Sequence, residues 1–179
     1  KTTWKNDPIV PLDAMSVQEP LGNAVHVVMK SDVRAKTVLI LGLGPTGLCA
    51  AAAAQALGAL KVIGIDPSEF RRNLGTDMGC DEIYDKVPEK YIGKCDVVLE
   101  MSGNKHAIQD GFEAIRIAGT YMAFGIPKED ITLNWGKYLI NKEITILSVF
   151  GRRMWETWVQ TTNLLKEGNT GDIPSLNSL

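Results

Sequence analysis

The glycine-rich segment at positions 42–47 is the feature of this sequence that most clearly could do chemistry. It has a GxGxxG spacing, and it follows an apolar run and precedes an alanine-rich run. In a strand-turn-helix unit, the first glycine permits the tight turn, the second admits a pyrophosphate, and the third lets the helix pack on the strand. Main-chain amides and the positive end of the helix dipole then form an anion site. The spacing predicts a dinucleotide-phosphate site that includes Gly42, Gly44, Pro45, Thr46 and Gly47.

A carboxylate at position 66 makes this interpretation more specific. Asp66 lies 24 residues after Gly42, at the end of the next apolar run. A carboxylate there accepts hydrogen bonds from the adenosine ribose and repels the 2′-phosphate of NADP, so we predict that NAD is preferred. The alternative is a structural role for Asp66 as the N-cap of a helix that begins near Ser68. Arg71 could contact the adenine face, or it could pair with Glu69 or Asp66 in solvent.

Two further turns follow apolar runs and are candidates for the other half of the dinucleotide. They are the segments 100–103, Glu-Met-Ser-Gly, and 124–127, Phe-Gly-Ile-Pro. In a doubly wound sheet, ligands lie outside the carboxyl ends of the strands, so we expect both turns to border the nicotinamide. The alternative for each residue is ordinary strand-to-helix turn chemistry.

The elements that must position these residues alternate along the chain between strand-length apolar runs and segments of helical period. This pattern predicts an α/β fold, a Rossmann doubly wound parallel six-stranded sheet with helices on both faces. The expected strands are 37–41, 61–66, 82–84, 95–101, 119–124 and 143–149. The expected helices are 17–30, 45–57, 68–78, 105–117, 135–140 and 154–167. Residues 78–95 leave little room for a helix between the third and fourth strands. We expect a lead-in segment at 1–20, a nucleotide-binding domain at 21–170 and a tail at 171–179.

Composition excludes several other classes of function. The 19 basic and 21 acidic residues leave no positive excess to hold a nucleic acid. No apolar run reaches the roughly 18 residues of a membrane span, and the first residues lack the apolar stretch of a signal peptide. Three widely spaced cysteines form neither a disulfide framework nor a CxxC zinc site. We therefore expect a soluble cytoplasmic protein with a small-molecule substrate and no nucleic-acid or membrane partner.

Three stretches of the chain resemble the zinc-containing medium-chain dehydrogenase family, and the resemblance covers nearly the whole sequence. The stretch 18–26, Gln-Glu-Pro-Leu-Gly-Asn-Ala-Val-His, is similar to the family's lead into its cofactor domain, and 42–47 is similar to its GxGPxG turn. The stretch 151–158, Gly-Arg-Arg-Met-Trp-Glu-Thr-Trp, resembles a G-R-x-x-[FW]-[DE]-T-W run. This third stretch favours the threonine dehydrogenases of the family over its polyol and secondary alcohol dehydrogenases.

The resemblance implies roles for individual residues. Those that line the cofactor would be Thr46, Ile126, Val149 and Phe150, in addition to Phe124 and Gly125 of the turn described above. Asp66 and Arg71 would hold the adenosine. Glu19 would belong to the catalytic zinc site, and Arg152 is a candidate for the active-site rim. The implied reaction is hydride transfer from C3 of L-threonine to NAD, which gives 2-amino-3-oxobutanoate, with zinc polarising the alcohol oxygen.

The sequence also departs from the family pattern. The upstream Cys and His ligands of the catalytic zinc and any four-cysteine structural lobe have no counterpart here. Because Glu19 alone cannot hold zinc, we expect the catalytic GroES-like domain to be absent and the isolated chain to be inactive. A non-catalytic nucleotide-sensing module is the alternative.

Two smaller features complete the sequence-based expectations. The last predicted strand is apolar and could pair with a partner copy, so we expect a homodimer or homotetramer. Tyr138 and Lys142 match the YxxxK spacing of short-chain dehydrogenases, but the glycine pattern of that family differs, so we interpret the match as chance.

Overall fold

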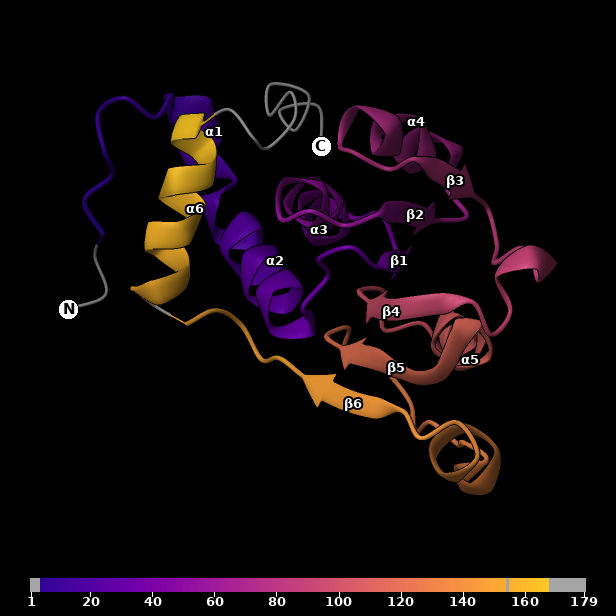
Figure 1. Cartoon of the computed structure of the whole chain (residues 1–179). Helices are drawn as coiled ribbons and strands as arrows, with labels where there is room; N and C mark the ends of the chain where they lie inside the picture. Colours follow the sequence, from indigo (N-terminus) through magenta and orange to yellow (C-terminus); the bar gives the residue numbers. More distant parts are fainter. Residues whose placement is uncertain (1–3, 154, 168–179) are drawn as a thin grey trace.

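A single parallel sheet forms the centre of the computed structural model, which describes residues 4–153 and 155–167. Within these residues the strands are β1 Thr37–Leu41, β2 Lys61–Ile65, β3 Glu82–Tyr84, β4 Cys95–Glu100, β5 Ile115–Ala123 and β6 Thr145–Ser148. Their order in the sheet is β3-β2-β1-β4-β5-β6, and every neighbouring pair is parallel (Figure 1). The order reverses between β1 and β4, which is where a doubly wound sheet opens a crevice. The predicted fold class is confirmed.

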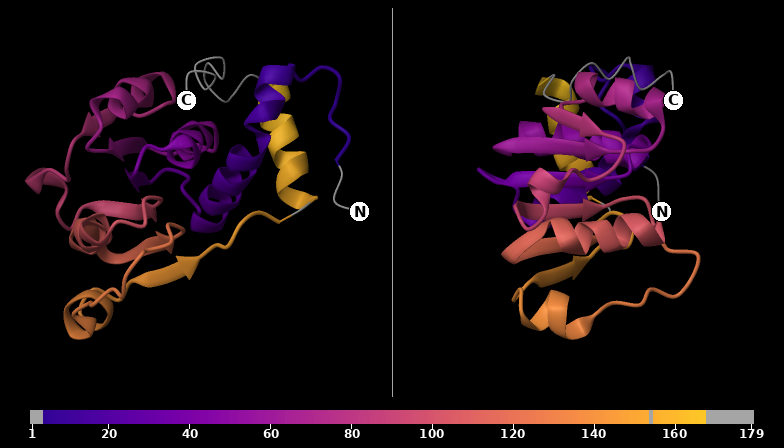
Figure 2. Two further views of the ribbon diagram at one scale, coloured as in Figure 1. Left: turned by 180° about the vertical axis from the view of Figure 1, so that it is seen from behind. Right: turned by 90° about the vertical axis from the view of Figure 1, so that its right-hand side faces the viewer.

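Helices cover both faces of this sheet. The α-helices are α1 Leu12–Ser16, α2 Gln18–Ser31, α3 Pro45–Ala56, α4 Glu69–Asp77, α5 Lys105–Ala114 and α6 Glu156–Glu167. Two single turns, the 3-10 turn η1 Glu89–Tyr91 and the π-turn η2 Gly136–Ile140, complete the elements. Helices α2, α3 and α4 pack on one face, and α5 with η1 and η2 packs on the other (Figures 1 and 2). None of the described helices is long and apolar enough to cross a membrane.

Strand β1 shows how the two faces share one element. Its side chains alternate between the faces, as the period of a strand requires. Val38 and Ile40 belong to the apolar core under α2 and α3, whereas Leu39 and Leu41 belong to the core under α5. All four are fully buried. A central strand that is buried on both faces therefore appears in the sequence as an uninterrupted apolar run.

The N-terminal segment and α6 form an additional layer outside α2. Figure 2 shows α2 between α6 and the sheet. Val10 and Ala14 are buried in the same core as α2, and Lys166 of α6 forms an ion pair with Asp7. Helix α2 runs without interruption through position 20, so the expected limit between lead-in and domain falls inside a helix. The proposed domain limits remain a prediction, and the tail at 171–179 lies outside the described residues.

The prediction of a helix through residue 117 was wrong. Helix α5 ends at Ala114 and β5 begins at Ile115. The Lys142 ammonium accounts for this end, because it donates hydrogen bonds to the carbonyls of Phe112, Glu113 and Ile115. The register of β5 against β4 then shifts between Cys95 and Val97.

Other differences are smaller. Helix α1 was not predicted, and the segment expected as a helix at 135–140 is a π-turn. The expected strand at 143–149 is β6, which is shorter at both ends. The expectation of little room between the third and fourth strands is confirmed, because only η1 lies between β3 and β4. The three cysteines are buried and free.

Candidate dinucleotide-binding site

The glycine turn between β1 and α3 has three positions with different steric requirements. Gly42 has a φ of +97°, and a Cβ there would lie 2.9 Å from the Cβ of Ser102. A Cβ at Gly47 would lie 1.9 Å from the carbonyl oxygen of Gly42, so the helix could not approach the turn. A Cβ at Gly44 would meet nothing within 4 Å. The first and third glycines are therefore required by packing, and the second faces open space at the N-terminus of α3.

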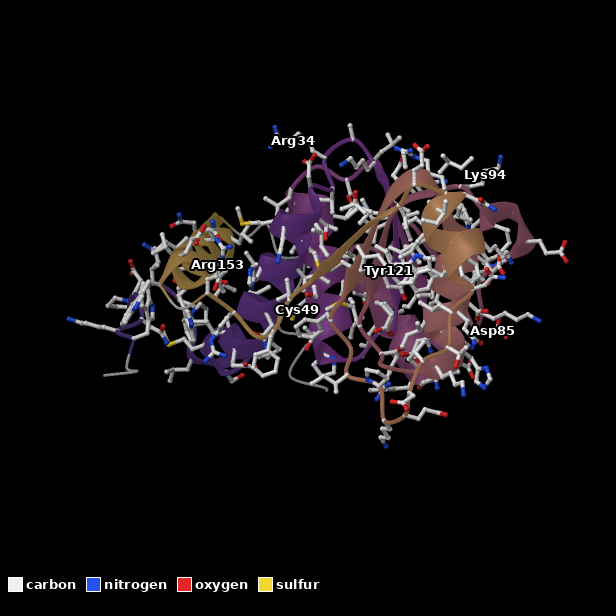
Figure 3. The ribbon with its side chains drawn as sticks, turned by 90° about the horizontal axis from the view of Figure 1, so that it is seen from below. Arg34, Cys49, Asp85, Lys94, Tyr121 and Arg153 are labelled. Atoms are coloured by element: carbon white, nitrogen blue, oxygen red, sulfur yellow. The ribbon has the colours of Figure 1, made fainter. Side chains whose placement is uncertain are left out.

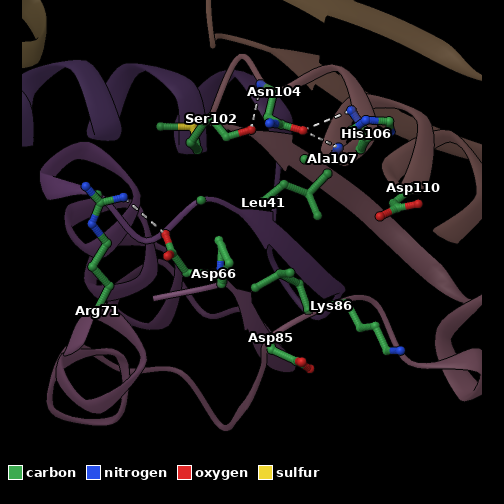
Figure 4. A pocket seen from close by; sticks show the side chains of 15 residues that line it. Leu41, Asp66, Arg71, Asp85, Lys86, Ser102, Asn104, His106, Ala107 and Asp110 are labelled. Atoms are coloured by element: carbon green, nitrogen blue, oxygen red, sulfur yellow. Dashed lines mark hydrogen bonds and ion pairs between the residues drawn. The ribbon is translucent and has the colours of Figure 1, made fainter. Parts of the chain in front are cut away.

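A pocket of about 440 Å³ lies beside this turn, at the edge of the sheet where the strands end (Figure 4). Leu41, Ile65 and Ala107 contribute apolar surface to it, and Asp66 and Arg71 lie at one end. Figure 3 shows Asp85 at one edge of the sheet and Arg34 and Lys94 at the opposite edge. Asp85 lines the pocket, whereas Arg34 and Lys94 precede strands β1 and β4. The pocket therefore occupies the carboxyl edge of the sheet, as the ligand rule for doubly wound sheets predicts.

Asp66 is only 2% exposed, and its carboxylate joins two turns. Its Oδ2 accepts a hydrogen bond from the Leu43 amide at 2.9 Å, and its Oδ1 accepts one from the Ser68 amide at 2.9 Å. Arg71 Nη1 lies 3.5 Å from Oδ2, so Arg71 pairs with Asp66 and not with Glu69 in this structure. The N-cap of α4 is Ser68, and Asp66 supports that cap from two residues upstream. Each carboxylate oxygen can accept a second hydrogen bond.

The turns after β4 and β5 pack against each other through glycine. Glu100 is 1% exposed, and its Oε1 accepts hydrogen bonds from Ser102 and Gly103. A Cβ at Gly103 would lie 2.5 Å from the carbonyl oxygen of Ile126, and a Cβ at Gly125 would lie 2.1 Å from the Gly103 amide nitrogen. Both glycines are thus needed for the contact between the two turns, which supports the turn-chemistry alternative for these residues.

The structure brings together one part of the predicted site and leaves the other part separate. Gly42, Gly44, Asp66 and Arg71 line the pocket. The first turn of α3 contains the remaining predicted phosphate-side residues, Pro45, Thr46 and Gly47. Of the residues expected around the nicotinamide, Met101 and Ser102 after β4 line this pocket. Those at the ends of β5 and β6 do not, namely Phe124, Gly125, Ile126, Val149 and Phe150. Among them Ile126 is 77% exposed and Phe150 is 92% exposed.

Comparison with known proteins identifies the family to which this chain belongs. Residues 45–167 match the family model described as zinc-binding dehydrogenase. The chain belongs to the zinc-binding dehydrogenase family. This membership confirms the resemblance found in the sequence and favours the dehydrogenase interpretation over a nucleotide-sensing module.

Similar individual proteins agree with the family assignment. L-threonine 3-dehydrogenase from Caldanaerobacter subterraneus subsp. tengcongensis is 36% identical over 179 residues, which cover 95% of this chain and 52% of that protein. L-threonine 3-dehydrogenase from Pyrococcus furiosus is 36% identical over 183 residues, which cover 97% of this chain and 53% of that protein. The structure of L-idonate 5-dehydrogenase from Escherichia coli shares the fold, with a TM-score of 0.86, 24% identity, and coverage of 94% of this chain and 50% of that one. The chain spans about half the length of the curated relatives that it matches.

The residues of this chain that the structure describes do not by themselves fit a zinc ion. They contain no group of three or more His, Cys, Asp or Glu that could hold a metal. Glu19, the one predicted ligand, lies in the first turn of α2, where its Oε1 is 2.6 Å from Arg152 Nη1 and accepts a hydrogen bond from Asn23. The Arg152 guanidinium also lies 5.4 Å from the ring centroid of Trp158. Glu19 and Arg152 are therefore brought together, but as an ion pair.

The YxxxK residues have structural roles, which agrees with their interpretation as a chance match. Tyr138 donates a hydrogen bond to Glu113, and this bond raises the pKa of the Tyr138 phenol. Lys142 binds the last carbonyls of α5, and partial burial lowers the pKa of its ammonium. Both side chains connect the β5–β6 crossover to α5, on the face of the sheet that α5 covers.

Sequence analysis missed the polar residues at the far end of the pocket. These are Asp85 and Lys86, which directly follow β3, and His106 and Asp110, which lie in α5. The rule that ligands lie beyond the carboxyl ends of strands points to the first two, because they follow the short third strand. His106 and Asp110 are four residues apart on one face of α5, and that spacing was the available signal.

Proposed function

We propose that this chain binds NAD as the cofactor domain of a medium-chain dehydrogenase that oxidises C3 of L-threonine to give 2-amino-3-oxobutanoate. The observation that carries the proposal is the glycine turn, whose open position at Gly44 lies beside a pocket that also contains Asp66. The names of the relatives and the stretch 151–158 support threonine as the substrate. A polyol or other secondary alcohol is the alternative substrate within the family.

The residues of this chain would bind and orient the cofactor. The pyrophosphate would lie against Gly44 and the first-turn amides of α3, which no side chain caps. The ribose hydroxyls would donate hydrogen bonds to the remaining lone pairs of Asp66, and they would approach from the side where Arg71 is half exposed. When bound, NAD supplies the hydride acceptor, and the protein supplies position and polarity.

The nicotinamide half of the site remains a prediction. The turns that contain Phe124, Gly125 and Ile126 lie at the same edge of the sheet as the pocket, as do Val149 and Phe150. We place the nicotinamide across the ends of β5 and β6 on this ground, and we keep Arg152 as a candidate for the rim. We also propose that residues beyond those described here supply the remaining zinc ligands and that the chain alone does not turn over substrate in the reducing cytoplasm where we expect it.

Calorimetric titration with NAD and NADP tests the proposal. NAD should bind at least about tenfold more tightly, a difference of 1.4 kcal/mol. A Gly44→Ala variant should lose most of its affinity for NAD, because its methyl group would occupy the space proposed for the pyrophosphate. Its thermal stability should change little, because that space is empty of protein atoms.

The choice of variant matters because Asp66 also holds the fold together. An Asp66→Ala change would leave the Leu43 and Ser68 amides without their acceptors, so a loss of binding could reflect misfolding. Gly44→Ala avoids this ambiguity. If neither nucleotide binds at millimolar concentration, or if Gly44→Ala binds NAD as the parent does, the proposal is wrong.

We also propose that the chain self-associates through β6. This strand lies at the end of the sheet and pairs only with β5 in the described chain. Ile146 on β6 is 43% exposed and Phe150 beyond it is 92% exposed, so a second copy could extend the sheet and cover both. Sedimentation equilibrium should show a dimer or tetramer, and a monomer at all concentrations would contradict the proposal.

A further inference from the structure

The end of the pocket opposite Asp66 and Arg71 is formed by the first turns of α5 (Figure 4). Its role in binding a ligand rests on the proposed nucleotide binding. The first turn of α5 is fixed there, because the Asn104 side chain accepts hydrogen bonds from the amides of His106 at 2.9 Å and Ala107 at 3.2 Å. His106 and Asp110 follow on the same face of the helix and both line the pocket (Figure 4). A capped helix holds its side chains in place more firmly than a loop does.

The Asp110 carboxylate and the His106 ring have no hydrogen-bond or ion-pair partner among the described residues. Glu113, one turn further along α5, is bonded to both Lys137 and Tyr138. Burial raises the pKa of the Asp110 carboxyl, and nearby His106 opposes this shift. Asp110 is thus a partly desolvated acceptor for which the fold provides no donor, and such a group gains from a donor on a ligand.

The pocket between this face of α5 and Asp66 suits a flat heterocycle. Leu41, Ile65 and Ala107 provide apolar surface, and the polar groups lie at the margins. Apolar walls with a few convergent polar groups are typical of small-molecule sites. Because the pyrophosphate would lie at Gly44 and the ribose at Asp66, the next group along the dinucleotide, the base, would reach α5.

We propose that Asp110 and His106 select a 6-aminopurine at this end of the pocket. The exocyclic amino group of adenine would donate to the Asp110 carboxylate, and an adjacent ring nitrogen would accept from an N–H of His106. A 6-oxopurine has a carbonyl oxygen in place of the amino group and a proton on the adjacent ring nitrogen, which then cannot accept from His106. That oxygen would face the carboxylate, and two acceptors without a proton between them repel.

Asp85 and Lys86 offer a second acceptor and donor on the other side of the pocket mouth. They follow a three-residue strand and precede the short crossover, whereas His106 and Asp110 belong to a capped helix. We assign the base contact to α5 for this reason. An Asp85→Asn variant removes the same charge from the same pocket and serves as the matched control.

Calorimetry with NAD and with nicotinamide hypoxanthine dinucleotide tests the inference, because the two ligands differ only at one edge of the base, in the 6-amino or 6-oxo group and in the proton that hypoxanthine carries on N1. The parent chain should bind NAD about tenfold more tightly. In Asp110→Asn this ratio should fall to about threefold or less, because a carboxamide can turn its NH₂ toward the carbonyl of hypoxanthine. Asp85→Asn should keep the parent ratio, and thermal unfolding should confirm that both variants fold.

The outcomes separate this inference from the function on which it rests. Equal binding of the two dinucleotides by the parent chain would overturn base selection and leave NAD binding intact. An unchanged ratio in folded Asp110→Asn, or a ratio that falls in Asp85→Asn instead, would overturn the assignment to α5. Absence of binding by both dinucleotides would refute the proposed function itself.

Discussion

The glycine turn and the short β3–β4 crossover are two solutions to the same problem of connecting parallel strands. In the first, close packing of glycine and apolar side chains shapes the turn between β1 and α3, and the Asp66 carboxylate joins it to the turn after β2. In the second, a single carboxylate replaces the missing helix. Glu82 accepts hydrogen bonds from Tyr84 at 2.7 Å, Tyr91 at 2.6 Å, Lys90 at 2.8 Å and Lys61 at 2.9 Å.

The two regions therefore depend on different forces. The glycine turn depends mainly on shape, so its stability should respond to the volume of the side chain at each glycine position. The crossover depends on charge, since the hydrogen bonds from Lys90 and the two tyrosines hold the pKa of the Glu82 carboxyl well below its usual range. Substitutions in each region should therefore respond differently to volume and to pH.

Gly47→Ala should have the largest effect. Its Cβ would lie 1.9 Å from the carbonyl oxygen of Gly42, so α3 or the turn must move. We expect a loss of about 3 kcal/mol in the free energy of unfolding. Urea unfolding followed by tryptophan fluorescence measures it. Gly44→Ala is the matched control, and it should change stability by no more than about 1 kcal/mol. Equal losses of stability in the two variants would contradict the conclusion that close packing at Gly47 is what stabilises the turn.

Glu82→Gln should lower the urea midpoint at pH 7 by less than Gly47→Ala does, because Lys61 and Lys90 would lose their anionic partner. A carboxyl whose pKa is lowered in the folded state stabilises the fold above its unfolded pKa, and this stabilisation is lost as the pH falls through the folded pKa. The difference between parent and variant should therefore be complete above about pH 4.5 and shrink on acidification. Glu129→Gln, which breaks one exposed ion pair, is the control. A difference that does not vary with pH would refute the charge-based account.

Tyr91→Phe should have the smallest effect. It removes one of the four donors to Glu82 and leaves the largely buried ring in place, so a loss of about 0.5 to 1 kcal/mol is expected. Unfolding in urea at pH 7 measures it, with Tyr84→Phe for comparison. No measurable loss would mean that the ring, and not the hydrogen bond, stabilises η1.

These two regions also differ in how far the sequence predicts them. The apolar run and glycine spacing placed β1 at the observed residues and α3 within one residue. Asp66 was found as a candidate ligand, but its bonds to the Leu43 and Ser68 amides were not, because they depend on how two turns meet in space. The Glu82 network was invisible for a similar reason, since lysines and tyrosines are common and their convergence is a tertiary property. The start of β5 was missed because Ile115 fits a helical pattern equally well, and the Lys142 contact that ends α5 comes from 27 residues away.

The contact between Gly103 and Gly125 has an evolutionary consequence. Each position is closed to any side chain by the main chain of the opposite turn, so a change at one cannot be offset by a smaller residue at the other. Pairs of this kind leave no trace of correlated substitution, because neither member has an alternative that the other could accommodate. We therefore expect variation that tunes this edge of the sheet to come from the side chains around the two turns and not from the glycines themselves.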